Sequence, residues 1–569
     1  MRVKKYLSLT IVLVLILTAL TGCGKKDVVN DTESQENEGQ VAAEKSIDSE
    51  QYLNLVMVAE PSTLDASKGS DAYSNDILNE VLEPLTRLEE LEEDEELKNV
   101  LRPAGASEWT HNEDGTVWTF KIRDAKWSDG VAVRAQDYEY GIKRSLAQDT
   151  AAPYAYLLAP IKNATKVNSG QLPLEELGVR SIDDNTLEIT LESPTPYFLQ
   201  LTYQRVMMPQ RQDIIERHKD KYGSEMDTLV YNGPFTITNW VHNSEMVLTK
   251  NDNYWDKDTV KLNNINIKIL NDENAIYNSL SNRSIDVSRV GKPEWIEKFK
   301  GNKDLNHIEV TSPQTFFKFF NTKDKVFSNA NVRKAFALAI DREELANVIF
   351  HGINVPAYGW VSPNILIGDD EFRSVSEEPI RKLAADNPNP KALLIKGLEE
   401  LGMDTDPSKL TVKMTLGSTD QWFRTYGEYV QQMYNKNLGV NFEVEFVEWP
   451  VFTSMTEKGE FQIGYMAWGA EFNDPISLLS LLKSDAGSIQ TGWSNERYDE
   501  LIDLASKEMD PKKRLEYFAE AEKILLYDEA VLAPTVYPKY NIFRYKYVQN
   551  LGVTPFGTAG YKYGFTQGR

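Results

Sequence analysis

The clearest hydrophobic pattern in the chain is at its N-terminus. Three basic residues, Arg2, Lys4 and Lys5, precede Tyr6–Leu20, a run of 15 mostly apolar residues without a charge. A basic start followed by an apolar stretch too short to span a bilayer comfortably is typical of a secretory signal peptide rather than a membrane helix. We therefore predict that residues 1–22 are a signal peptide and that the remaining chain is exported.

The folded body is expected to begin at Tyr52. Leu53–Val58 is a short apolar run and Trp118–Arg123 alternates apolar with polar residues, so both patterns predict strands. The acidic run Glu89–Glu96 has no matching basic run nearby, which favours a solvated loop or helix face.

Helical periodicity appears in the second half of the chain. Apolar residues recur at three- and four-residue spacing over 332–340, which predicts a helix with one buried stripe. Asp341 with Glu344 is typical of the start of a second helix, which Gly352 could end. The segment 410–467 then alternates in type: strands at 410–416, 440–447 and 461–467 enclose a helix capped by Ser418 and a second helix at 449–455. Strand–helix alternation of this kind indicates an α/β layer domain.

Composition and charge exclude several functions. The 569 residues carry 62 Lys+Arg against 86 Asp+Glu, for a net charge of −24, and loss of residues 1–22 takes it to −27 because three cations and no anion leave. Such an acidic chain is not expected to bind nucleic acid. A single Cys excludes an intrachain disulfide and a Cys-rich zinc site. The five His have no metal-ligand spacing and no nucleophile or nucleotide motif is present, so we expect no metal, no cofactor and no enzyme activity.

The one cysteine stands where the apolar run ends. Leu20-Thr21-Gly22-Cys23 resembles the bacterial lipobox, which implies that the Cys23 thiol carries a diacylglyceryl group and that cleavage occurs before it. The alternative is an ordinary signal peptide with a chance Cys. Gly24–Gln51 contains no aromatic residue and many acids and amides, so it predicts a flexible linker. We expect residues 23–51 to tether the body to the extracellular face of a cell membrane by lipid alone. The length of the linker favours a Gram-positive cell.

Several separate motifs carry a resemblance to one family. They are Ala59-Glu60-Pro61-Ser62-Thr63-Leu64-Asp65, Trp118–Arg123 followed by Trp127-Ser128-Asp129-Gly130, Tyr231-Asn232-Gly233-Pro234-Phe235, Phe319-Phe320-Asn321-Thr322, Ala339-Ile340-Asp341-Arg342 and Trp468-Gly469-Ala470-Glu471-Phe472-Asn473-Asp474-Pro475. Together the motifs resemble the bacterial extracellular solute-binding proteins of family 5, the oligopeptide- and dipeptide-binding components of ABC importers. The resemblance implies an α/β, two-lobed, periplasmic-binding-protein-like fold with an extra inserted domain and a hinge. Its domains would be 52–75 with 201–310 and 533–569 (domain I), 76–200 (domain II) and 311–532 (domain III).

The resemblance also implies a set of peptide-binding residues. Glu471 takes the place of the family's aspartate that pairs with the peptide α-ammonium, and Trp449 and Trp468 would line side-chain pockets. At positions where short-peptide binders carry cations, this sequence has Phe423, Thr456 and Tyr465. Because these three residues are uncharged, the resemblance implies a site that is less strict about peptide length, unless Arg424 supplies the missing cation. The expected site consists of Glu60, Tyr231, Asn232, Gly233, Phe423, Trp449, Tyr465, Trp468, Gly469 and Glu471.

The leading hypothesis is therefore a monomeric, lipid-anchored oligopeptide receptor that delivers its ligand to the permease subunits of an ABC importer. The same fold binding a peptide pheromone, a sugar, haem or a metal complex is the alternative. A surface enzyme and a structural adhesin stay open as other classes, although the enzyme lacks a catalytic motif and the adhesin lacks repeats and a wall-sorting signal.

Overall fold

The computed structural model describes residues 46–93, 96–552, 556 and 560–569, with the side chains of residues 90–99 excepted. The expected signal peptide, Cys23 and the linker up to residue 45 lie outside the described residues. The end of the expected linker is ordered: the Asp48 amide donates to the Thr566 carbonyl over 3.1 Å, and the Gln51 side chain donates to the same carbonyl over 2.8 Å. The folded body thus begins near Asp48, before Tyr52, because these residues bind the C-terminal segment.

A four-stranded sheet combines the first strand of the folded body with three strands from residues 235–269. Its order is β1 (Tyr52–Met57), β10 (Asn264–Ile269), β9 (Glu245–Lys250) and β8 (Phe235–Val241), and β1 pairs in parallel with β10. The strand predicted from the apolar run Leu53–Val58 is confirmed as β1, and its side chains are alternately buried, as strand geometry requires. Helix α1 (Ala72–Val81) follows β1 and packs against β8.

A second four-stranded sheet is formed by residues 106–190. Its antiparallel order is β4 (Ala106–His111), β5 (Val117–Ile122), β7 (Thr186–Thr190) and β6 (Val179–Asp183), with α2 (Ala135–Leu146) packed on β6 and β7. The predicted strand at 118–123 is confirmed as β5. Apart from residues 94 and 95, which lie outside the described residues, the acidic run is in strands rather than in a loop or helix: β2 (Thr86–Glu93) pairs antiparallel with β3 (Glu96–Pro103), because backbone pairing tolerates acidic side chains along a two-stranded ribbon.

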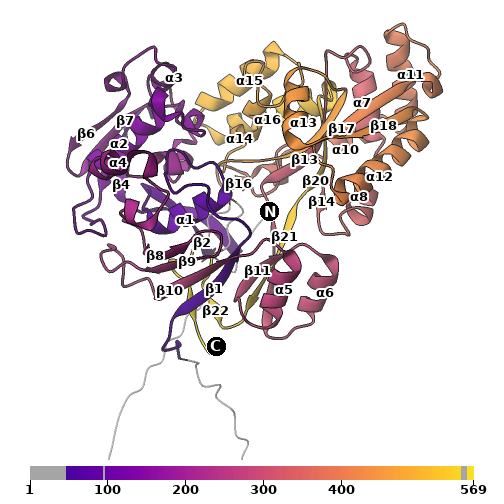
Figure 1. The fold of residues 1–569 in the computed structure, drawn as a ribbon. Coiled ribbons are helices and arrows are strands. Elements are labelled where there is room, and N and C mark those ends of the chain that lie inside the picture. Colours follow the sequence, from indigo (N-terminus) through magenta and orange to yellow (C-terminus); the bar gives the residue numbers. More distant parts are fainter. Residues whose placement is uncertain (1–45, 94–95, 553–555, 557–559) are drawn as a thin grey trace, which may run out of the picture. The chain divides into compact units, whose positions relative to one another are not determined.

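The largest sheet has six strands and forms the core of the other lobe (Figure 1). Its order is β14 (Val355–Pro356), β20 (Leu532–Tyr537), β13 (Gln314–Phe320), β19 (Ile463–Gly469), β17 (Thr411–Leu416) and β18 (Asn441–Phe446). All six residues of β20 are buried, because helices and loops cover both faces of this sheet. The predicted strand–helix alternation over 410–467 is confirmed.

Helix starts in this lobe follow side-chain capping. Asp341 accepts from the Glu344 amide at the start of α8 (Arg342–Val348), as predicted, but α8 ends before Gly352. Helix α12 (Gln421–Leu438) is capped by Asp420 rather than Ser418, because the Asp420 carboxylate accepts from the Phe423 amide while the Ser418 hydroxyl donates to Asp420. Helix α7 (Ala330–Leu338) buries the predicted apolar stripe.

Two adjacent segments connect the lobes. β12 (Leu305–Thr311) continues through Ser312 and Pro313 into β13, and β20 continues through Pro538 into β21 (Lys539–Tyr545). The Ser312 amide donates to the Pro538 carbonyl over 2.8 Å, so the segments lie side by side. A three-stranded sheet, β11 (Val287–Val290), β21 and β12, lies below them in Figure 1. The chain thus leaves the six-stranded sheet at Pro538; the expected three-domain division itself stays a prediction.

Shorter elements complete the fold. Within the described residues, no helix is long and apolar enough to cross a membrane. The remaining helices are α3 (Ala164–Asn168), α4 (Gln212–His218), α5 (Glu273–Ser281), α6 (Pro293–Lys300), α9 (Phe372–Val375), α10 (Pro379–Asp386), α11 (Pro390–Glu400), α13 (Trp449–Glu457), α14 (Ile476–Leu479), α15 (Glu496–Lys507) and α16 (Pro511–Lys523), and the remaining strands are β15 (Leu366–Ile367), β16 (Asp370–Glu371), β22 (Val548–Gln549) and β23 (Phe565–Thr566).

Candidate functional site

A small polar cavity of about 90 Å³ lies between the two lobes, beside the connecting segments. Helix α1 and the segment 203–205 contribute residues from one lobe, and the segment that follows β19 contributes Ala470 and Glu471 from the other. The cavity therefore combines groups that are remote in sequence. It is lined by Asn75, Asn79, Tyr154, Tyr203, Gln204, Arg205, Ala470, Glu471 and Phe556.

Glu471 is the anionic group of this cavity. Its backbone is fixed on both sides: the amide donates to the Ser477 hydroxyl over 2.8 Å, and the carbonyl accepts from the Gln204 side chain over 2.8 Å. Burial raises the pKa of the Glu471 carboxyl, while the Arg205 charge and a hydrogen bond from Tyr156 act in the opposite direction. Among the described residues, no cation lies within ion-pair distance of this carboxylate. It is therefore available to a cationic ligand group.

Two other lining residues carry buried polar atoms that have no hydrogen-bond partner among the described residues. These atoms are Asn79 Nδ2 and Arg205 Nη1, although the two residues are only 5% and 7% exposed. The other terminal nitrogen of Arg205 donates to the Asp71 carbonyl over 3.1 Å. An unsatisfied buried polar group costs about 1–3 kcal/mol. The cavity thus offers hydrogen-bond donors that a ligand acceptor would satisfy.

Strand β19 brings two predicted site residues towards this cavity. Trp468 and Gly469 are its last residues, and the Ala470 amide that follows donates to the Pro313 carbonyl over 2.8 Å. A Cβ on Gly469 would lie 2.9 Å from Gln314 Cγ, so the neighbouring strand explains this glycine. Trp468 is half-buried against the core.

Two aromatic residues of the predicted site lie on helix starts in the same lobe. Trp449 begins α13, is 52% exposed and stacks on Phe452 with ring centroids 5.4 Å apart. Phe423 lies in the first turn of α12, half-buried, with its ring edge against Trp422. Arg424, next to it, uses its Nε to donate to the Thr419 carbonyl. Exposed aromatic surface of this kind suits apolar ligand side chains.

Two other predicted site residues, Tyr465 and Glu60, and the uncharged position Thr456 have structural partners instead. Tyr465 is 1% exposed and stacks on Tyr426 in the core, with ring centroids 4.3 Å apart. Thr456, also buried, donates to the Thr453 carbonyl. The Glu60 carboxylate accepts from Trp240, His242 and Asn243, and these hydrogen bonds lower the pKa of Glu60 although burial alone would raise it. None of these three lines the described cavity.

Tyr231, Asn232 and Gly233 hold the end of helix α1. The Tyr231 hydroxyl donates to the Met226 carbonyl over 2.9 Å, and the Asn232 side chain accepts from the Glu83 amide over 3.0 Å. The Gly233 amide donates to the Val81 carbonyl over 2.9 Å, and a Cβ at Gly233 would lie 2.6 Å from the backbone of Val81. The structure does not bring these three residues to the cavity; they position the helix that lines it.

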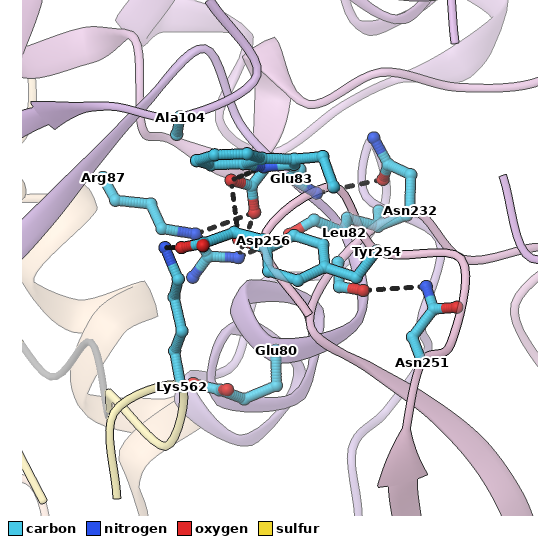
Figure 2. A network of polar contacts seen from close by, with 12 residues as sticks. Glu80, Leu82, Glu83, Arg87, Ala104, Asn232, Asn251, Tyr254, Asp256 and Lys562 are labelled. Carbon is cyan, nitrogen blue, oxygen red and sulfur yellow. Dashed lines mark hydrogen bonds and ion pairs between the residues drawn. The ribbon is translucent and has the colours of Figure 1, made fainter. Parts of the chain in front are cut away.

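A buried charged network extends this support (Figure 2). The Glu83 carboxylate accepts from Arg87 over 2.6 and 2.8 Å, from the Tyr254 hydroxyl over 3.1 Å and from the Trp255 indole over 3.2 Å. Lys562 from the C-terminal segment pairs with Asp256 over 2.9 Å. The network joins the segment after α1, the segment after β9 and the C-terminal segment, next to the end of the helix that lines the cavity.

Sequence reasoning missed most of the cavity. Asn75, Asn79, Tyr154, Tyr156 and Arg205 carry no motif by themselves, and the contact between residues 204 and 471 joins positions 267 apart in sequence. Of the residues that line the cavity, the sequence identified only Glu471, through the motif Trp468–Pro475. Within the described part of the chain, no group of three or more His, Cys, Asp or Glu side chains is arranged to hold a metal ion.

Comparison with known proteins identifies the family. Residues 100–490 match the family described as bacterial extracellular solute-binding proteins, family 5 Middle. The chain is 32% identical over 539 residues to the oligopeptide-binding protein OppA of Bacillus subtilis, covering 93% of this chain and 94% of the relative. The substrate-binding domain of an oligopeptide ABC transporter from Bacillus anthracis superposes with a TM-score of 0.73 at 33% identity, covering 92% and 100% of the two chains. Listeria monocytogenes OppA bound to peptide gives a TM-score of 0.73 at 30% identity, covering 91% and 99%. This chain belongs to the bacterial extracellular solute-binding proteins of family 5, and its fold is the two-lobed α/β fold of that family.

Proposed function

We propose that this protein captures oligopeptides between its two lobes and delivers them to the permease subunits of an ABC importer. The observation that carries the proposal is the Glu471 carboxylate, which lines an interlobe cavity without an ion-pair partner among the described residues. A ligand that contacts both lobes stabilises the closed arrangement, which is how a receptor of this kind presents a loaded state to its transporter.

The chemistry of the cavity matches the N-terminal residue of a peptide. An α-ammonium group is a cation with three donors, and a buried carboxylate is its natural partner. The first carbonyl of the peptide is an acceptor for Asn79 Nδ2 or Arg205 Nη1, which lack partners within the described structure. A sugar supplies no cation for Glu471, so the same cavity favours an amine-bearing ligand.

Relatives support a peptide ligand. The Bacillus subtilis relative is named an oligopeptide-binding protein, and the Listeria monocytogenes structure is described as bound to peptide. Both align with more than nine-tenths of this chain. We therefore assign peptide binding to this protein as well, without a catalytic role and without a cofactor.

We further propose that the receptor is a monomer held on the extracellular face of a Gram-positive membrane through diacylglyceryl-modified Cys23. Support comes from the Leu20–Cys23 motif, from the long polar linker and from the similarity to a Bacillus relative. Two acyl chains give stable anchoring where one gives only reversible attachment. Metabolic labelling with an alkyne fatty acid tests this: wild type should be labelled, and Cys23→Ala should not.

Native mass spectrometry of the purified protein tests the ligand class. The full-length chain is isolated from its host without denaturation, and any bound molecule is released and sequenced. Recovery of peptides with free N-termini is the expected result. Recovery of a sugar or a metal complex without peptide would contradict the proposal.

A further inference from the structure

The two lobes touch each other directly beside the cavity. The ring of Tyr197 stacks on the ring of Phe472, with centroids 5.3 Å apart and an angle of 14° between the planes. One residue earlier, the Glu471 carbonyl accepts from the Gln204 side chain over 2.8 Å. Phe472 is buried, so this contact is shielded from water. Two consecutive residues of one lobe are therefore bound to the other lobe by protein groups.

Tyr197 is held firmly by its own lobe. It directly precedes the short 3₁₀ helix Phe198–Leu201, whose first and last residues are buried. The Phe198 ring packs against Trp118 and Phe120 of β5, with ring centroids 5.4 and 6.3 Å away. The backbone that carries the Tyr197 ring therefore moves only with its lobe.

Phe472 is held equally firmly on the other side. The side chain of the next residue, Asn473, accepts from the first amide of β15 over 2.8 Å. Asp474 then forms two hydrogen bonds of 2.8 Å with Arg514, and both side chains are buried. Because the backbone around each ring is fixed to its own lobe, the stack of Tyr197 on Phe472 breaks when the lobes move apart as bodies in a hinge motion.

The lobes also meet at the turn between β4 and β5. This turn and the loop between α15 and α16 belong to different lobes (Figure 1). A Cβ on Gly115 in the turn would lie 3.8 Å from Met509 Cε in the loop, an ordinary van der Waals distance. The Trp118 indole donates to the Gly115 carbonyl over 3.0 Å, and its ring packs on Phe198. The turn and the stacked Tyr197 are thus parts of one rigid surface.

We propose that the Tyr197–Phe472 stack is a latch that keeps the lobes closed whatever the cavity contains. A stacked aromatic pair favours its contact by up to about tenfold, and a hydrogen bond such as that of Gln204 adds about fivefold. Opening breaks both contacts, so we expect the open form to be a minor population of about 2%. A ligand enters through this minor form, which slows its association. The inference goes beyond the proposed function and does not depend on the ligand class.

Double electron–electron resonance tests the latch on the full-length protein. Bound molecules are removed by unfolding in guanidinium and refolding, and native mass spectrometry verifies their removal. Spin labels are attached to p-acetylphenylalanine in place of Ile182 in one lobe and Leu504 in the other, two exposed residues, so that Cys23 is not used for labelling. The protein with the latch intact should give one main distance, that of the closed lobes. Tyr197→Ala should raise the ratio of open to closed molecules about tenfold, which appears as a second, longer distance.

Three variants assign the effect to the stack. Tyr197→Phe keeps the ring and should stay closed, whereas Phe472→Ala should open the lobes as Tyr197→Ala does. The double variant Tyr197→Ala with Phe472→Ala should be no more open than either single variant, because the same contact is lost. Thermal unfolding curves establish that each variant is folded. A mainly long distance in the protein with the latch intact, unchanged distances in both alanine variants, or opening by Tyr197→Phe overturns the latch, and the proposed peptide function stands in each case.

Discussion

Replacement of Glu83 by Gln is the sharpest test of how the cavity wall is held. The Glu83 side chain is 2% exposed and its carboxylate accepts four hydrogen bonds, two of them from Arg87, which is 11% exposed. Glutamine keeps one oxygen for Tyr254 and Trp255 but places an amide NH₂ group against the guanidinium. Arg87 then becomes a buried cation that has no anion at hydrogen-bond distance among the described residues.

The expected cost follows from that loss. Removing one partner of a buried ion pair destabilises a protein by about 3–5 kcal/mol, because the remaining charge stays desolvated. This is a large part of the 5–15 kcal/mol that is typical of a folded domain. Urea unfolding followed by far-UV circular dichroism measures it, with a lower unfolding midpoint expected for Glu83→Gln. The matched control is Glu520→Gln, which removes a solvent-exposed pair with Arg497 and should leave the midpoint close to that of wild type.

A double-mutant cycle identifies the source of the cost. If the unpaired charge is responsible, Glu83→Gln combined with Arg87→Met should be less destabilising than the sum of the two single substitutions. A midpoint for Glu83→Gln that equals the wild-type value, or strictly additive single effects, would refute the reasoning that this ion pair fixes the end of α1.

Two further predictions concern the same helix. Burial raises the pKa of Glu80 from 4.5 to about 8, so the folded state binds the proton more tightly than the unfolded state and stability falls as pH rises between these values. Relative to Glu80→Gln, wild type should lose up to about 3 kcal/mol between pH 5 and pH 7, as measured by urea unfolding; parallel pH profiles would contradict this. Gly233→Ala should lower the melting temperature by several degrees, because its Cβ would lie 2.6–2.8 Å from backbone atoms of Glu80, Val81 and Leu82. An unchanged melting temperature would contradict this and would show that the backbone at the end of α1 moves to accommodate the added methyl group.

Hydrophobic periodicity predicted the elements that have one buried face. The strands at 411–416, 441–446 and 463–469 and the helix at 330–338 were found because their apolar residues repeat with the period of the element. The hairpin β2–β3 was missed because its pairing is a backbone property that acidic side chains conceal. The cap of α12 was misplaced by two residues, because Ser418 and Asp420 are both good caps and only the geometry decides between them.

The site was harder to predict than the fold. Glu471 was found because it lies in a motif, whereas Asn79 and Arg205 acquire their role only when the two lobes meet. The aromatic residues in the motifs could not be assigned from the sequence, because a large ring suits a core and a ligand pocket equally well. In the structure Trp449 is exposed, whereas Tyr231 and Tyr465 are buried.

The most direct test of the central claim compares a peptide with its N-acetylated form on wild type and Glu471→Gln, by isothermal titration calorimetry. Acetylation removes the α-ammonium charge, and the substitution removes the carboxylate that is expected to meet it. Wild type should bind the free-amine peptide at least tenfold more tightly than the acetylated one, and Glu471→Gln should bind the two with similar affinity. If Glu471→Gln weakens the binding of both forms equally, Glu471 does not receive the peptide amine and the account is contradicted.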